Sequence, residues 1–212
     1  MTKDKARDAW DDLYSKHGIQ FGGAGDLEPL LKVLEPQMLV LDVGCGDGKS
    51  TEAIARSVEV VGCDFSREAL KYLRNHRDFR HGANLVECEM CSLPFGHNKF
   101  DAISCVHSLS HLLLNERRAA ATEMLRVVKP GGPIFIEAFD CEDLRFGHGA
   151  EIESSTYMRG NGILTHYFRK GEIATLFPSA SQVVETRLSR RVALGSKVGK
   201  RSVVRVLVRK KS

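Results

Sequence analysis

The sequence predicts an α/β fold, a doubly wound sheet of seven strands that are mostly parallel, with an antiparallel last strand. Short apolar runs, typical of strands buried on both faces, alternate with segments of helical periodicity. The first run, 38–43, ends in a glycine-rich turn that leads into a predicted helix. The last two runs, 183–192 and 202–209, flank a glycine-containing linker that suits a hairpin.

Length and composition set broad limits. The chain has 212 residues, of which 42% are hydrophobic and 27% charged, as is ordinary for a globular domain. No apolar run approaches the roughly 20 residues of a membrane span, and the polar start, 1–5, lacks a signal-peptide core. We therefore expect a single domain, 1–212, in the cytoplasm, with its cysteines as buried thiols.

Residues 1–36 are expected to form a helical cap. The first predicted helix, 4–17, carries Trp10 and Tyr14 on one apolar stripe. After a glycine-rich loop, a second helix is predicted over 26–34, with an aspartate at its start and a proline beyond its end.

The most informative stretch runs from Asp42 to Lys49. Gly44, Gly46 and Gly48 are separated by single residues, after a buried strand and before a helix predicted over 49–57. Glycine lets the backbone turn sharply and approach a ligand, and a helix N-terminus offers free N–H groups. The spacing is tighter than the G-x-G-x-x-G of dinucleotide sites. A nucleotide-type site is predicted; a strand-to-helix turn without a ligand is the alternative.

The segment Asp42–Gly48 resembles the first motif of class I S-adenosylmethionine (AdoMet)-dependent methyltransferases, of the type 11-like group. The resemblance covers roughly residues 39–208 and implies a Rossmann-like fold with AdoMet as cofactor. It implies that the glycine loop, with Asp42 near it, lies against the methionine end of AdoMet: Gly44, Cys45, Gly46 and Gly48. The N-terminal segment would fold over the cofactor, and three of its aromatic residues could line the site: Trp10, Tyr14 and Phe21. Packing of Trp10 and Tyr14 on the core is the alternative.

A second apolar run, 59–64, ends in Asp64, 20 residues past the first glycine of the loop. An adjacent parallel strand would place a carboxylate there beside a ribose. This carboxylate can accept hydrogen bonds from both ribose hydroxyls. Asp64 is therefore a predicted ribose ligand, with Phe65 beside it in the cofactor site. Capping of the next predicted helix, 66–79, is the alternative, although Ser66 fits that role.

The third run, 83–88, leads into a stretch where the family often has Asp-Ala-x-x-Leu-Pro-Phe. This chain has Glu89 at the acid position and Met90 after it. In the family the acid or its neighbour's backbone meets the adenine, so the resemblance implies this role for Glu89 or for the backbone of Met90. The glutamate is one methylene longer than the family's aspartate. Cys88 and Cys91 form one isolated pair, and zinc sites normally use four ligands, so no metal is predicted.

The fourth run, 100–106, ends in Val106, which the resemblance places in the cofactor site. His107 and His111 follow at the carboxyl end of this strand, where open parallel sheets bind ligands. A neutral histidine can accept a proton from a hydroxyl or amine near pH 7, so both are predicted catalytic residues. For His111, packing or capping of the next helix is the alternative.

The next predicted helix, 115–128, ends at a Lys-Pro-Gly-Gly turn, a family hallmark, before the strand 134–138. Residues 139–163 are expected to be a long loop on the ligand side of the sheet that shapes the acceptor pocket. His166 and Tyr167, in an aromatic stretch before the last helix, are further site candidates.

From Arg187 onward the chain has ten Lys or Arg residues and no acid. A phosphate-binding stripe that recruits RNA is one interpretation, with sequence-independent and salt-sensitive affinity. A solvated hairpin whose charged edge blocks aggregation is the other.

The histidine-bearing segment and residues 115–118 look most similar to the tRNA wobble-uridine branch of the family. That branch methylates a carboxymethyl group on tRNA, and some members need a small zinc-binding partner protein. The resemblance implies methyl transfer from AdoMet, with a tRNA nucleoside as one acceptor. The alternatives are a small-molecule methyltransferase with a quinone-like, thiol or amine acceptor, and a protein that binds AdoMet without catalysis.

Overall fold

The computed structural model describes residues 3–17, 27–76, 83–194 and 197–212. Its strands are β1 (Leu39–Val43), β2 (Glu59–Asp64), β3 (Ala83–Glu87), β4 (Ala102–Val106), β5 (Pro133–Phe139), β6 (Ala150–Glu153), β7 (Thr156–Met158), β8 (Leu164–His166), β9 (Ala180–Leu194) and β10 (Lys197–Lys210). Its helices are α1 (Lys3–His17), α2 (Glu28–Leu31), α3 (Lys49–Ala55), α4 (Arg67–His76), the 3-10 helix η1 (Ser108–His111), α5 (Leu114–Val127) and α6 (Glu172–Thr175).

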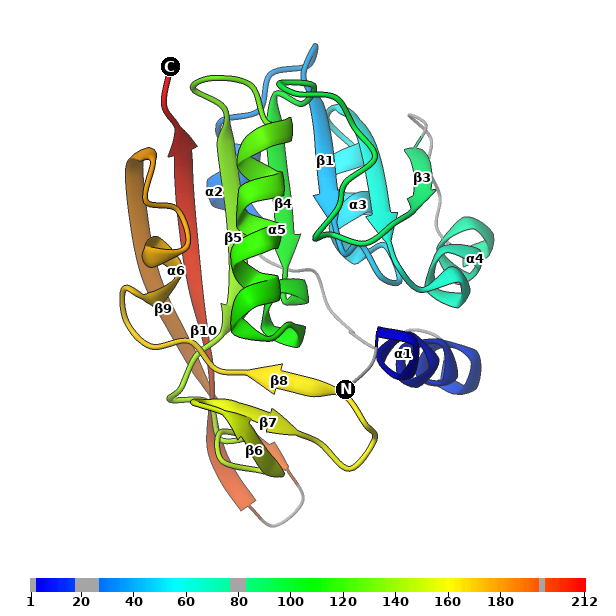
Figure 1. The fold of residues 1–212 in the computed structure, drawn as a ribbon, viewed down its shortest axis with the longest axis vertical. Coiled ribbons are helices and arrows are strands. Elements are labelled where there is room, and N and C mark those ends of the chain that lie inside the picture. The colour runs from blue at the N-terminus through cyan, green and yellow to red at the C-terminus, as the bar shows by residue number, and fades with distance from the viewer. Residues whose placement is uncertain (1–2, 18–26, 77–82, 195–196) are drawn as a thin grey trace.

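Seven strands form the central sheet, in the order β3-β2-β1-β4-β5-β10-β9 (Figure 1). The first five strands in this order pair in parallel. β10 runs antiparallel to both of its neighbours, β5 and β9. The predicted fold class, a mostly parallel sheet with an antiparallel last strand, is confirmed. Because neighbouring parallel strands end at the same edge, the loops after β1, β2 and β4 come together there.

Both faces of the sheet are buried. On one face, α5 contributes Met124 and Val127 to a core shared with alternate residues of β10, such as Val204 and Val206. On the other face, Leu30 of α2 and Ile54 of α3 pack with Phe135 of β5. Burial on both sides explains why the central strands read as continuous apolar runs rather than as alternating ones.

Residues 139–163 differ from the predicted long loop. They contain β6 and β7, which join β8 in a three-stranded antiparallel sheet. The strands have only 3 or 4 residues each, too few for their alternation to be read from the sequence. Phe139, Tyr157 and Tyr167 pack together at the base of this small sheet.

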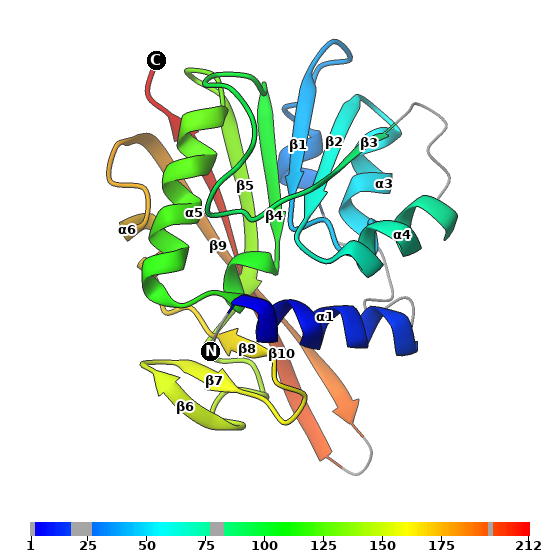
Figure 2. The same ribbon diagram turned by 45° about the vertical axis from the view of Figure 1, so that its right-hand side comes forward.

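The predicted cap, 1–36, divides into two parts. α1 crosses the carboxyl ends of the central strands (Figure 2), while Leu30 of α2 packs against the sheet. α2 has 4 residues and is shorter than the predicted helix 26–34. The final hairpin is longer than predicted, with strands of 15 and 14 residues. In the described part of the chain, no helix is long and apolar enough to cross a membrane.

Candidate functional site

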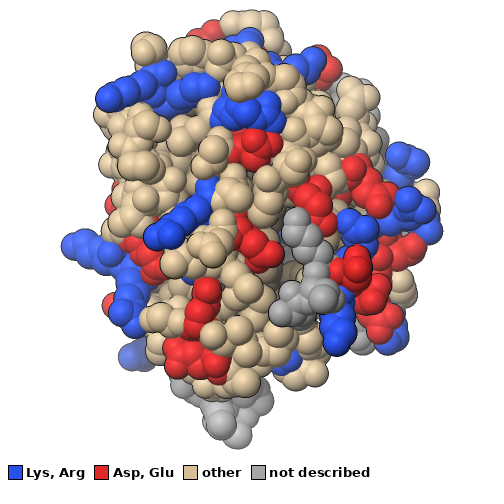
Figure 3. Space-filling model, in the orientation of Figure 1, with Lys and Arg blue, Asp and Glu red and all other residues tan. Residues whose placement is uncertain are grey.

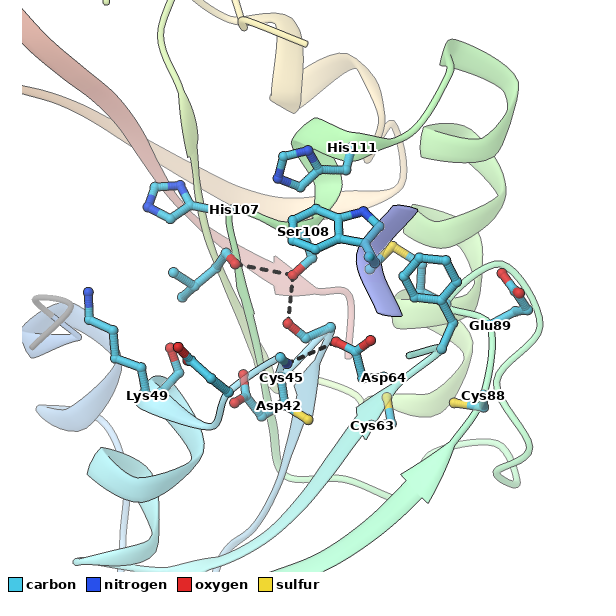
Figure 4. A pocket seen from close by; sticks show the side chains of 18 of the residues that line it. Asp42, Cys45, Lys49, Cys63, Asp64, Cys88, Glu89, His107, Ser108 and His111 are labelled. Atoms are coloured by element: carbon cyan, nitrogen blue, oxygen red, sulfur yellow. Dashed lines mark hydrogen bonds between the residues drawn. The ribbon is translucent and has the colours of Figure 1, made fainter. Parts of the chain in front are cut away.

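A pocket lies at the carboxyl ends of β1, β2 and β4 (Figure 4). Helix α1, which crosses these strand ends in Figure 2, contributes Trp10 and Tyr14 to its lining. Nine of the ten residues predicted for the cofactor site line the pocket: Asp42, Gly44, Cys45, Gly46, Asp64, Phe65, Glu89, Met90 and Val106. Gly48 is not among the lining residues. A Cβ at Gly48 would lie 1.8 Å from Leu73 Cδ1, so this glycine allows the loop to pack on α4.

The glycine loop is held by β2 and by η1. The N–H groups of Gly44 and Cys45 both donate to the Cys63 carbonyl, at 2.8 and 3.0 Å. Ser108 Oγ donates to the Gly44 carbonyl at 2.8 Å. Gly44 has a φ of +68°, and a Cβ there would lie 2.2 Å from Ser108 Oγ. The loop therefore needs glycine at this position both for its backbone and for contact with η1.

Asp64, at the end of β2, is 7% exposed. Its Oδ2 accepts the N–H of Gly46 at 2.8 Å and its Oδ1 accepts the N–H of Ser66 at 2.9 Å. Each oxygen has a further acceptor position for a ligand hydroxyl. Burial raises the pKa of this carboxyl to about 6. The cap of α4 is Ser66, as predicted, because its hydroxyl accepts the N–H of Ala69 at 3.1 Å.

Asp42 lies beneath the glycine loop and is 1% exposed. Thr51 of α3 donates its hydroxyl to Asp42 Oδ2 at 2.7 Å, which ties the strand end to the helix after the loop. Burial raises the pKa of Asp42 to about 6, and the nearby Asp64 carboxylate also raises it. Two carboxyl groups with raised pKa values in one pocket favour a cationic ligand there.

Polar contacts from Arg7 and Asp11 fasten helix α1 across the pocket. Arg7 Nη2 donates to Glu89 Oε1 at 3.0 Å, so one oxygen of this predicted adenine contact already accepts a hydrogen bond. Ser66 Oγ donates to Asp11 Oδ1 at 2.5 Å. Glu89 therefore anchors the helix that covers the pocket, as well as lining the pocket itself.

Trp10 and Tyr14 line the pocket from α1, with ring centroids 5.8 Å apart. Tyr14 is also buried, and a Cβ at Gly46 would lie 2.5 Å from its hydroxyl oxygen. Its ring therefore rests on the glycine loop. Tyr14 both lines the pocket and packs on the core, so the two alternatives for this residue hold together. Phe21, the third aromatic candidate, lies outside the described residues.

His107 lines the pocket at the end of β4 but is tied to β5. Its Nε2 lies 3.2 Å from Glu137 Oε1, and its ring stacks on Phe139 with centroids 4.4 Å apart. Burial lowers the pKa of His107 to about 3, with smaller contributions from nearby positive charges. This ring is neutral at physiological pH and is held in place by Glu137 and Phe139.

His111 lines the same pocket, and Figure 4 shows its ring on the same side as that of His107. Its Nδ1 lies 2.6 Å from the Leu164 carbonyl oxygen. A carbonyl can only accept, so Nδ1 carries the proton and Nε2 of the neutral ring has a lone pair. Burial lowers the pKa of His111 to about 4, so the ring is neutral near pH 7. His111 can therefore accept a proton or a hydrogen bond through Nε2.

Several pocket residues were not selected from the sequence: Asp47, Lys49, Ser50, Cys63, Cys88, Ser108 and Leu112. Cys63 and Cys88 each directly precede a selected residue, so their position in the sequence could have indicated that they line the pocket. Ser108 lies between the two selected histidines, but its contact with Gly44 joins segments 64 residues apart and has no local signature.

His166 and Tyr167 do not line the pocket. His166 is 1% exposed and hydrogen-bonds Thr156 Oγ1 and Glu172 Oε1, each at 2.7 Å, so it joins β7 and β8 to α6. Tyr167 is packed with Phe139. Within the described ranges, no three metal-ligating side chains form a group.

The fold and the pocket can now be compared with known proteins. Residues 40–132 match the family model described as a methyltransferase domain. A SAM-dependent methyltransferase from Methanosarcina mazei superposes with a TM-score of 0.71 at 20% identity, over 87% of this chain and 98% of that one. The chain therefore has the fold of SAM-dependent methyltransferases, and its residues 40–132 match a methyltransferase domain.

Two further comparisons bear on particular relatives. A Burkholderia thailandensis 1,6-didemethyltoxoflavin-N1-methyltransferase, solved with bound S-adenosylhomocysteine, has a TM-score of 0.60 at 20% identity, covering 98% of this chain and 79% of that one. The mouse protein named tRNA N(3)-cytidine methyltransferase METTL2 is 28% identical over 167 residues, or 72% of this chain. The chain spans 43% of the length of the mouse protein.

Proposed function

We propose that this chain transfers the methyl group of AdoMet to an acceptor bound beside His111. The observation that carries the proposal is a second pocket that shares a wall with the first. Trp10 and His111 line both pockets, while Phe139 and Ile163 line the second one alone. A donor in the first pocket and an acceptor in the second would meet at His111, and such positioning supplies much of the rate of a bimolecular reaction.

The donor and acceptor groups of the first pocket fit AdoMet. Asp64 keeps acceptor positions for the ribose hydroxyls, and the buried carboxylates of Asp42 and Asp64 favour the positive charge of a sulfonium and an ammonium. Phe65, Met90 and Val106 supply apolar walls. We assign cofactor binding to nine lining residues, Asp42, Gly44, Cys45, Gly46, Asp64, Phe65, Glu89, Met90 and Val106, and an indirect, packing role to Gly48.

When bound, AdoMet supplies a methyl group that joins the acceptor lone pair as the carbon–sulfur bond breaks and its electron pair stays on sulfur. Trp10 and the rest of α1 exclude water from the two pockets. His111 Nε2 takes the proton of a hydroxyl or amine acceptor, and a carboxylate acceptor needs no base. His107, held by Glu137 and Phe139, is better suited to shaping the site than to moving a proton.

A tRNA nucleoside is the first candidate acceptor. It is supported by the similarity to the mouse protein named as a tRNA N(3)-cytidine methyltransferase, although the chain spans less than half of that protein. The exposed Arg190 and Arg191 of β9 are available for phosphate contacts. The wobble-uridine specificity, the small zinc-binding partner and the cytoplasmic location stay predictions.

A small-molecule acceptor is the second candidate, and the charge pairing of the β9–β10 hairpin favours it. Four of its basic side chains pair with acids of β5 and the segment after it: Arg187 with Asp140, Lys200 with Glu142, Arg201 with Asp143 and Arg205 with Glu137. Figure 3 shows acidic and basic side chains interspersed over one face of the molecule. The hairpin is therefore less cationic than its sequence indicates.

Labelled AdoMet tests these functions. The purified chain is incubated with [methyl-³H]AdoMet and either the RNA or the small-molecule fraction of a cell extract, and S-adenosylhomocysteine and the labelled product are measured. Label in RNA supports the first acceptor, and label in small molecules supports the second. Binding of S-adenosylhomocysteine without transfer to either fraction would indicate a binding protein. Failure to bind it would overturn the cofactor assignment.

A further inference from the structure

The second pocket has an unusual charge composition. Its apolar walls include Trp10, Phe139 and Ile163. Its two formally charged lining side chains are Arg145 and Arg159, and neither Asp nor Glu belongs to the lining that the structure describes. An aromatic pocket with two guanidinium groups and no carboxylate suits a planar, anionic ligand.

The positive charge of Arg145 is only partly balanced. Arg145 Nε lies 2.7 Å from Asp143 Oδ1, but Arg201 Nε also lies 3.0 Å from Oδ2 of the same carboxylate. Two guanidinium groups thus share one carboxylate, which leaves a net positive charge. The guanidinium of Arg145 also lies over the Phe139 ring, 4.4 Å from its centroid, so it is positioned at the pocket wall.

Arg159 contributes a second positive charge. Among the described residues, no carboxylate lies within ion-pair distance of its guanidinium. The positive charge of Arg159 also affects His111. Burial is the main cause of the lowered pKa of His111, and the charges of Arg159 and Arg145 lower that pKa further. The same charge of Arg159 reaches the hydroxyl of Tyr167, a buried group that has no hydrogen-bond partner in the described residues. Arg159 and Arg145 thus both line the second pocket and both act on His111.

From this arrangement we propose that Arg145 and Arg159 bind an oxyanion of the acceptor, a carboxylate or a phosphate group attached to a planar ring. The ring lies against Trp10, and the methyl-accepting atom is directed to His111. This inference rests on the proposed function, because it assigns the substrate class of the second pocket. Guanidinium groups bind carboxylates and phosphates through paired N–H donors, so the anchor also fixes the orientation of the ring.

The chain contains one tryptophan, Trp10, and it lines both pockets. Its fluorescence therefore reports binding in either pocket. The free protein and the protein saturated with S-adenosylhomocysteine are each titrated with two matched pairs of probes, benzoate against benzamide and cytidine 5′-monophosphate against cytidine. Benzoate tests a carboxylate anchor and the nucleotide tests a phosphate anchor. Calorimetry repeats each titration without an optical signal.

Arg159→Gln is the test variant, because Arg159 forms no ion pair with the residues that the structure describes and its replacement breaks none there. Arg118→Gln is the matched control, since Arg118 is an exposed guanidinium on α5. We expect at least one anion to bind at least tenfold more tightly than its neutral partner. We expect Arg159→Gln to abolish that preference, and Arg118→Gln to preserve it. Neither variant should change the affinity for S-adenosylhomocysteine.

Three results would overturn the proposal: equal binding of the charged and neutral probes, an anion preference that survives in Arg159→Gln, or no saturable response to either anion in both forms of the protein. A failure of the proposed function has a different signature. S-adenosylhomocysteine itself would then not bind, while the titrations of the free protein would still test the anion site.

Discussion

The ring of Trp10 packs edge-on against the ring of His111, with centroids 4.8 Å apart and an interplanar angle of 74°. Trp10 belongs to α1 and His111 to η1, so the contact joins the helix that crosses the strand ends to the segment that follows β4. It forms the wall between the two pockets. It also shields His111 from water and thereby helps to keep the imidazole neutral.

The first prediction concerns the stability of this arrangement in acid. The pKa of His111 is lowered from 6.5 to about 4 in the folded protein, so between these values the unfolded chain binds a proton that the folded chain does not. His111 therefore lowers the stability as the pH falls through this range. The variant His111→Gln should lose less stability than the wild type between about pH 7 and pH 4.5 in urea denaturation.

His107 acts in the same direction, and Asp42 and Asp64, with raised pKa values, act in the opposite one. All three remain in the His111→Gln variant, so the difference between the two proteins isolates His111. Identical pH profiles would show that the ring is not kept neutral by its surroundings.

The second prediction concerns Asp64. The variant Asp64→Asn should bind S-adenosylhomocysteine and AdoMet at least tenfold more weakly, because the amide is a poorer acceptor for two ribose hydroxyls and its NH₂ group faces the N–H of Gly46 or Ser66. Isothermal calorimetry measures the change. Glu59→Gln is the control, since Glu59 is an exposed carboxylate at the start of the same strand. Unchanged affinity in Asp64→Asn would remove Asp64 from the site.

The third prediction follows from the raised pKa values of the pocket carboxyls. Asp42 and Asp64 both have a pKa of about 6, so both become neutral as the pH falls below that value. The attraction for a cationic ligand and the acceptor strength toward its hydroxyls then decrease together. The affinity for AdoMet should fall between about pH 7.5 and pH 5, and in Asp64→Asn it should fall less. An affinity that is constant with pH would contradict the raised values.

The fourth prediction separates structural from exposed arginines in the hairpin. Arg187 Nη1 lies 2.6 Å from Oδ1 of Asp140, whose side chain is 1% exposed. Arg187→Ala would leave this carboxylate buried without its partner and should cost about 3 kcal/mol of unfolding free energy. Arg191→Ala, at an exposed site on the same strand, should cost less than about 0.5 kcal/mol. Equal midpoints in urea denaturation would contradict the structural role of the pair.

The fifth prediction tests RNA contact without disturbing the fold. Arg190 and Arg191 are exposed, so replacing both with Ala should weaken RNA binding and flatten its dependence on salt if the hairpin contacts phosphates. The slope of log affinity against log salt, measured by filter binding, is the readout. Arg118→Ala on α5 controls for the loss of one positive charge elsewhere. If slope and affinity both stay constant, the hairpin is a solvated edge.

Much of the first pocket was accessible from the sequence. Gly44 and Asp64 could be recognised because Gly44 directly follows a buried strand, Asp64 is the last residue of another, and adjacent parallel strands end at one edge of the sheet. The positions of these residues relative to their strands therefore predict that they lie close together in space. The antiparallel final hairpin was also readable, since its two strands are consecutive. The pairing of β1 with β4 and of β5 with β10 joins strands that are not consecutive, so the order of the strands was not predicted.

The second pocket and the charge balance of the hairpin could not be read this way. Arg187 and Asp140 are 47 residues apart, and a count of charges along the tail omits the acids that β5 and its following segment bring to it. Arg145 and Arg159 flank β6 and β7, strands too short to show a period, and face a common cavity only because that small sheet folds against Phe139. Local patterns specify strands, turns and the ends of neighbouring strands. The contacts that set net charge and acceptor chemistry join distant segments, and these arise only when the whole chain packs.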